Sequence, residues 1–194
     1  SAAVVSLYPL DATGGGELFT VQAAQAIAAA GERAVIATPV DLLPPRSDVR
    51  ARLDARFVVA EAGADASPDV LPWSEVLAQL ADHDYVWVHQ YLAADLVFDV
   101  IAAAASDQRL LFTSHGFEML RDLFAGIYQP CHRHHFVEVS AYAARRAAKY
   151  APRATWAHAA VWRADFAPVA AAAGPRPRDF TALGRVLPHK GLET

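Results

Sequence analysis

Short apolar runs alternate with longer amphipathic segments along this chain of 194 residues. Strand-like runs occupy residues 3–8, 34–38, 57–61, 85–89, 110–114, 136–139 and 155–161. Segments with helical periodicity occupy residues 17–30, 73–81, 93–105 and 141–150. Because the helices that connect parallel strands must cover both faces of the sheet, this order predicts an α/β fold with a doubly wound, Rossmann-like parallel sheet.

Two residues mark the ends of predicted helices, and the predicted sheet indicates where a ligand should bind. Gly31 stands just after the helical segment 17–30, at the usual C-terminal cap position, and Ser140 precedes the segment 141–150 as a good N-cap. In doubly wound sheets, ligands bind beyond the carboxyl ends of the strands. We therefore expect functional side chains where the predicted strands end.

Polar residues follow the fourth and fifth predicted strands. His89 and Tyr91 stand at the end of the fourth, and His115 and Glu118 follow the fifth. A neutral imidazole can donate a hydrogen bond to a phosphate or a hydroxyl group, and the glycine after His115 permits close approach of a ligand. A core histidine satisfied by the backbone is the alternative at both positions, and Glu118 is either a contact for a substrate hydroxyl or a helix cap.

Three glycines, Gly14, Gly15 and Gly16, separate the first strand from the first helix. They let the backbone turn sharply and approach a ligand, and the N–H groups at the helix start favour an anion or sugar oxygens. The spacing fits neither the dinucleotide fingerprint, because position 19 is Phe, nor a P-loop, because no Gly-Lys-Ser/Thr follows. A tight turn without a ligand remains the alternative.

Two cations stand in the last segment of the chain. An apolar run at 180–183 leads to Arg185, and Lys190 follows after a proline turn. Arg185 offers a planar fork and Lys190 a flexible point charge, so together they can neutralise a diphosphate. We expect residues 179–194 to be the first strand and loop of a truncated second domain.

Composition narrows the class of protein. An apolar fraction of 54% with 20% charged residues is ample for a core, and the single Cys131 excludes a disulfide within the chain. Residues 1–130 carry 7 Lys and Arg against 17 Asp and Glu, whereas residues 131–194 carry 10 against 4. Without a nucleic-acid motif, this asymmetry favours small phosphates or an anionic membrane surface as partners over DNA or RNA. The N-terminus has no basic leader, and we expect a cytoplasmic protein.

A zinc site in the segment from Cys131 to His135 is not expected. Cysteine and histidine are preferred zinc ligands, but neighbours in an extended segment point to opposite faces, and no second cluster completes a tetrahedral site. We therefore predict no metal and no cofactor.

The motifs taken together resemble the retaining family 4 glycosyltransferases of GT-B fold. The resemblance rests on the glycine loop, on His89, on Thr113-Ser-His115-Gly, on Val139-Ser-Ala-Tyr142 and on Phe166-Ala-Pro168. Its most specific part is Gly184-Arg-Val-Leu-Pro-His-Lys190-Gly191. It covers essentially the whole chain.

The resemblance implies an acceptor-binding domain at 1–168, a linker at 169–178 and the start of a donor-binding domain at 179–194. A nucleotide-diphosphate sugar would be the donor, and a glycan, a lipid or a small molecule the acceptor. The implied diphosphate contacts are Gly15, Gly16, Arg185 and Lys190; the implied catalytic residue is His115; the implied acceptor contacts are His89, Tyr91 and Glu118. Transfer would proceed with retention and without a metal, and this piece alone would be inactive.

Departures from the family pattern leave other functions open. The chain has Ala159-Ala-Val-Trp162 where the family often shows Asn-Gly-Val-Asp. The main alternative is therefore a non-catalytic Rossmann-like module that binds a carbohydrate or a partner. A nucleotide-dependent oxidoreductase is less favoured, because the glycine spacing fails and no acidic residue ends the run at 34–38.

Overall fold

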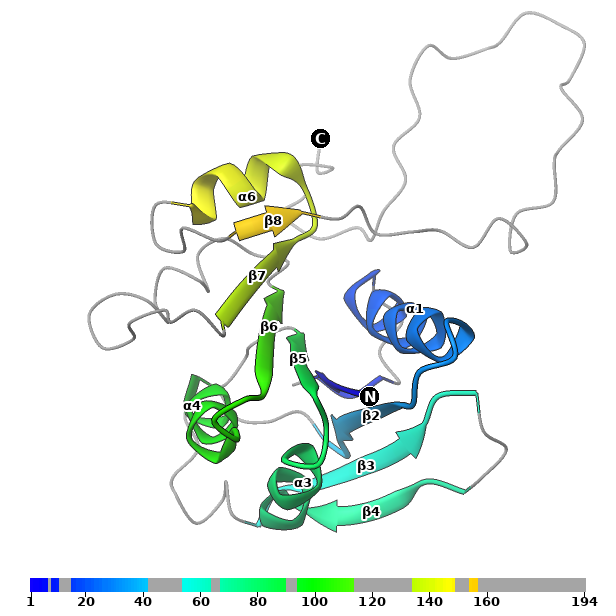
Figure 1. Ribbon diagram of the computed structural model, residues 1–194. Helices are drawn as coiled ribbons and strands as arrows, with labels where there is room; N and C mark the ends of the chain where they lie inside the picture. The colour runs from blue at the N-terminus through cyan, green and yellow to red at the C-terminus, as the bar shows by residue number, and fades with distance from the viewer. Residues whose placement is uncertain are drawn as a thin grey trace, which may run out of the picture. The chain divides into compact units, whose positions relative to one another are not determined.

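The computed structural model shows an α/β fold built on a mostly parallel sheet with helices on its two faces (Figure 1). It describes residues 1–6, 8–10, 15–41, 54–63, 67–89, 94–113, 134–148 and 154–156. The compact unit that holds the sheet spans Ser1–Ala160. The predicted linker at 169–178 and the predicted strand at 179–194 lie outside the described residues.

Eight strands form the sheet in the order β4-β3-β2-β1-β5-β6-β7-β8. Their bounds are β1 Ala2–Ser6, β2 Ala34–Pro39, β3 Arg56–Glu61, β4 Asp69–Pro72, β5 Tyr85–His89, β6 Arg109–Thr113, β7 His134–Glu138 and β8 Ala154–Trp156. The helices are α1 Gly15–Ala29, α3 Trp73–Leu80, α4 Ala94–Ala103 and α6 Ala141–Ala147. The strands and helices that the apolar runs predicted are therefore confirmed within two residues at each end, with β4 as an additional strand. The predicted ends of the last helix, at 149–150, and of the last strand, at 157–161, lie outside the described residues.

The prediction of a parallel sheet is wrong at one edge. β3 pairs antiparallel with β2, and β4 pairs antiparallel with β3, whereas the six strands β2, β1, β5, β6, β7 and β8 run parallel. The period of side chains is two residues in either orientation, so periodicity alone cannot give a strand's direction. Burial carries the missing signal: all of β1 is buried, whereas β3 has mostly half-exposed residues and Val70 of β4 is 45% exposed.

The two faces of the sheet have separate apolar layers. Ala24 of α1, with Ile27 and Ala28 beside it, packs against β1 and β2 on one face. α3 and α4 pack against the opposite face, where Trp73 is fully buried and stacks on Phe57 with ring centroids 4.6 Å apart. In a right-handed crossover, the direction in which the chain moves across the sheet decides which face its helix covers. The connections from β1 to β2 and from β5 to β6 run in opposite directions, so α1 and α4 lie on opposite faces.

The predicted caps are confirmed. Gly31, two residues after α1 ends at Ala29, has a φ of 86°, which a residue with a Cβ rarely adopts. Ser140 accepts a hydrogen bond at 3.1 Å from the backbone N–H of Ala143 and so caps α6. α1 begins at Gly15, two residues earlier than the apolar periodicity indicated.

Candidate functional site: the carboxyl edge at the switch point

The strand order reverses between β1 and β5. From β1 the chain moves through α1 to β2 on one side, and it later returns to β5 on the other side of β1 (Figure 1). The carboxyl ends of β1 and β5 therefore flank the topological switch point, where open α/β sheets bind ligands. This is the edge at which the sequence predicted functional side chains.

A row of polar residues crosses the sheet at this edge. Ser6 pairs in register with His89, and His89 pairs with Thr113, so the last residues of β1, β5 and β6 lie side by side. All three are completely buried. Buried polar groups are costly unless they form hydrogen bonds, so their partners decide what these residues do.

His89 is held by two residues of α1. Its Nδ1 lies 2.8 Å from the hydroxyl oxygen of Thr20, and the ring of Phe19 stacks on the imidazole with centroids 4.8 Å apart. Thr20 also donates a hydrogen bond at 3.0 Å to the carbonyl of Gly16. With its hydroxyl proton used there, Thr20 accepts from the Nδ1–H of His89. The end of β5 is thereby tied to the first turn of α1, where Gly15 and Gly16 lie.

The hydroxyls of Ser6 and Thr38 converge on a single backbone carbonyl. Ser6 donates to the carbonyl oxygen of Tyr8 at 2.9 Å, and Thr38 of β2 donates to the same oxygen at 2.7 Å. Two donors on one carbonyl fix the chain as it leaves β1. The hydrogen bond of 2.8 Å from the indole N–H of Trp87 to the hydroxyl of Thr113 joins the ends of β5 and β6 in the same way.

Glu138 differs from the rest of this edge. It ends β7, is 1% exposed, and its Oε1 has no hydrogen-bond partner in the part of the chain that the structure describes. Burial without a compensating partner raises the pKa of Glu138 from 4.5 to about 7. The sequence analysis did not identify this residue, although a carboxylate inside the apolar run Phe136-Val-Glu-Val139 is a signal that could have found it.

The structure places three of the predicted site residues at this edge. His89 lies in the buried row, and Gly15 and Gly16 form the first turn of α1, which the Thr20 bonds connect to it. The other predicted site residues lie outside the described residues: Tyr91, His115, Glu118, Arg185 and Lys190. Thr20 was not predicted, because a threonine within an amphipathic helix carries no distinctive sequence signal.

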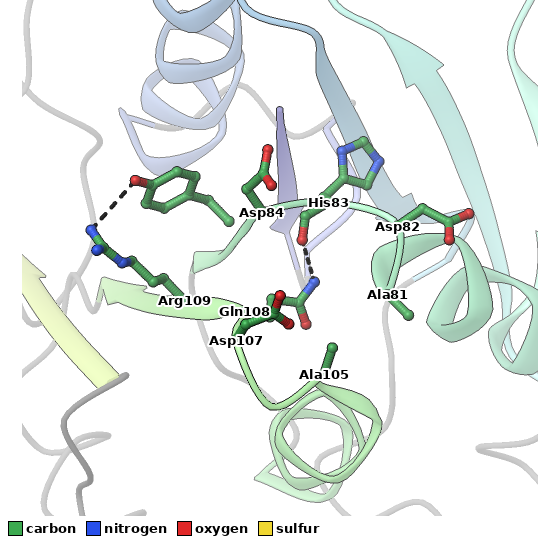
Figure 2. A pocket seen from close by; sticks show the side chains of 9 residues that line it. Ala81, Asp82, His83, Asp84, Ala105, Asp107, Gln108 and Arg109 are labelled. Atoms are coloured by element: carbon green, nitrogen blue, oxygen red, sulfur yellow. Dashed lines mark hydrogen bonds between the residues drawn. The ribbon is translucent and has the colours of Figure 1, made fainter.

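The opposite edge of the sheet has a polar cavity of about 330 Å³ (Figure 2). Buried Gln108 lies in its wall and donates from Nε2 to the carbonyls of Leu80 at 2.7 Å and His83 at 2.6 Å. Desolvation, followed by the charge of Arg33, lowers the pKa of His83. Asp82, Asp84 and Asp107 also line the cavity, but it lies at the amino ends of β5 and β6, away from the switch point. In Figure 2 the imidazole of His83 points away from Gln108, whose amide contacts its backbone.

The described residues contain no group of three or more His, Cys, Asp or Glu that could hold a metal ion. None of their helices is long and apolar enough to cross a membrane.

Comparisons with known proteins do not assign a family. No protein-family model matches the chain, and no curated protein matches it significantly. One solved structure that resembles it is a DUF4886 family protein from Bacteroides uniformis, with 16% sequence identity and a TM-score of 0.31. The match covers 58% of this chain and 48% of that protein, so the chain spans about half of its length.

Proposed function

We propose that this chain forms the acceptor-binding half of a GT-B, retaining glycosyltransferase. The enzyme transfers a sugar from a nucleotide-diphosphate sugar to a glycan, a lipid or a small molecule. The observation that carries the proposal is the connection between the glycine turn and the switch point. Thr20 links the carbonyl of Gly16 to the ring of His89, so the first turn of α1 and the carboxyl edge of the sheet are one hydrogen-bonded unit.

The chemistry of this unit suits a donor rich in phosphate and hydroxyl oxygens. The first backbone N–H groups of the 15-residue α1 have no partner within the helix, and the glycines allow a ligand close to them. In the proposed reaction, Arg185 and Lys190 neutralise the departing diphosphate, and His115 lines the cleft. Tyr91 and Glu118 contact the acceptor, the buried His89 positions the end of β5 from which Tyr91 follows, and no metal or cofactor takes part.

The location follows from the same proposal. A cytoplasmic enzyme has access to nucleotide sugars, and a lipid acceptor would bring it to an anionic membrane surface. The 10 Lys and Arg among residues 131–194 favour such contact, and Arg145 and Arg146 of α6 are exposed members of this group.

The test is transfer by the longest natural form of the protein. It is incubated with UDP- and GDP-sugars, and donor consumption and the anomeric configuration of any product are measured. We expect turnover with retention, and a loss of more than tenfold in kcat/KM for Lys190→Ala. Lys149→Ala removes the chain's other lysine and serves as the matched control.

Inert behaviour across all donors would contradict the proposal. It would favour the non-catalytic carbohydrate- or partner-binding module, for which the departure at residues 159–162 is the specific observation. Inversion of configuration would contradict the retaining mechanism while leaving a transferase.

A further inference from the structure

Among the described residues at the carboxyl edge, the buried polar residues form internal hydrogen bonds that explain their burial, except Glu138. Ser6, Thr38, Thr113 and His89 all bond to neighbouring protein groups. The Oε1 atom of Glu138 has no such partner among the described residues, although the side chain is 1% exposed. A buried polar atom that the fold does not satisfy indicates a role other than packing.

Glu138 lies on the same face of β7 as a residue of the apolar core, which makes its buried carboxyl group more unusual. Alternate residues of β7, His134, Phe136 and Glu138, are buried, and Phe136 is part of the main apolar core. Phe136 stacks on Phe112 of β6 with ring centroids 5.4 Å apart. An apolar side chain at position 138 would continue this layer without the cost of burying a carboxyl group.

Resting on the proposed function, we infer that Oε1 of Glu138 accepts a hydrogen bond from a hydroxyl group of the sugar acceptor. The residue ends its strand at the edge where ligands of such sheets bind. A hydroxyl is a neutral donor, and it satisfies the oxygen without bringing a second charge into an apolar layer. A metal ion is a poorer fit, because no group of three ligand residues exists in the described part of the chain.

The contact makes sugar binding depend on pH. A hydrogen bond from a hydroxyl stabilises the carboxylate more than the neutral acid, so bound sugar lowers the pKa of Glu138 from its raised value near 7. Binding therefore becomes tighter as the pH rises through this range. A glutamine at position 138 keeps an acceptor oxygen but does not titrate, so it retains the contact and loses the pH dependence.

The experiment uses the chain labelled with carboxyl-¹³C glutamate, with the Glu138 signal assigned from Glu138→Gln. Methyl α-glucopyranoside, methyl α-mannopyranoside and methyl α-galactopyranoside are the probes. We expect at least one of them to shift the Glu138 signal and to lower its titration midpoint by about 0.5–1 pH unit. We expect Glu138→Leu to weaken binding of that sugar about 5- to 10-fold, Glu138→Gln to weaken it less than about threefold, and exposed Glu75→Gln to leave it unchanged.

Two outcomes overturn the inference. One is a sugar that binds Glu138→Leu as tightly as the wild type. The other is a Glu138 signal that no sugar moves, which would indicate that the oxygen is satisfied within the protein. Transfer activity is measured separately, so the two hypotheses can fail independently. A sugar contact at Glu138 without transfer would refute the proposed activity and support the proposed contact. Transfer with an unchanged acceptor KM in Glu138→Leu would support the activity and refute the contact.

Discussion

The substitution Glu138→Gln should remove a pH dependence from the stability of the fold. The pKa of Glu138 is raised from 4.5 to about 7, so the folded state binds a proton that the unfolded state releases between these values. For an acid with a raised pKa, the wild type therefore loses stability as the pH rises from about 4.5 to 7. A shift of this size corresponds to about 3 kcal/mol at 1.36 kcal/mol per unit, which is a large share of a typical domain's stability.

Urea unfolding followed by tryptophan fluorescence at pH 4 to 8 measures the effect. The quantity of interest is the difference in unfolding free energy between Glu138→Gln and the wild type, which should increase by about 3 kcal/mol from pH 4 to pH 8. The lowered pKa values of His83 and His134 act in the opposite direction, because their contribution is lost as the pH falls below 6.5. Both proteins share these histidines, so their effect cancels in the difference. A difference that stays constant across this range would refute the burial argument for Glu138.

Three further substitutions test the hydrogen bonds that hold the sheet's edges, each by urea unfolding. Gln108→Leu should lower the free energy of unfolding by about 2–4 kcal/mol, because two backbone carbonyls lose their buried donor. The same change at exposed Gln79 should lower it by less than about 0.5 kcal/mol, and equal losses would contradict the role of these bonds. Thr20→Val should lower the free energy of unfolding by about 1–2 kcal/mol, because it removes the hydrogen-bond partner of a buried imidazole. Thr20→Ser keeps the hydroxyl and should retain most of this stability; if it is as unstable as Thr20→Val, the methyl group matters instead. Ser140→Ala should cost about 1 kcal/mol through the lost cap, and Ser140→Asp should be close to the wild type; a neutral alanine would contradict the capping role.

The sequence predicted the strands and helices well because the apolar runs and their periodicity lie within each segment and do not depend on distant residues. The helix caps at Gly31 and Ser140 are confirmed, since a positive φ and a capping hydroxyl are properties of single residues. The direction of β3 could not be predicted, because it depends on which strand it meets and not on its own side-chain period. β4 was missed because its four residues, Asp69–Pro72, contain only two adjacent apolar side chains, too few for a strand-like run.

The candidate site likewise contains a residue that the sequence predicts and partners that only the fold brings to it. The position of His89 at the end of β5 could be predicted from the sequence, because an apolar run ends there. Its partners Thr20 and Phe19 could not, because they lie 69 and 70 residues away in the sequence and meet it only in the fold. Glu138 could have been noticed as a charge within an apolar run, but its open oxygen is a property of the packed structure.

The internal hydrogen bonds at the carboxyl edge position the segments that leave it. Because Thr20 holds His89 and Trp87 holds Thr113, the ends of β5 and β6 are fixed relative to α1 and to each other. Tyr91 and His115 each follow two residues after one of these anchored ends, so the fold determines where the chain departs toward both predicted contacts. The strand-end residues thus act by positioning, and Glu138 is the described member of this edge whose chemistry is not already used by the fold.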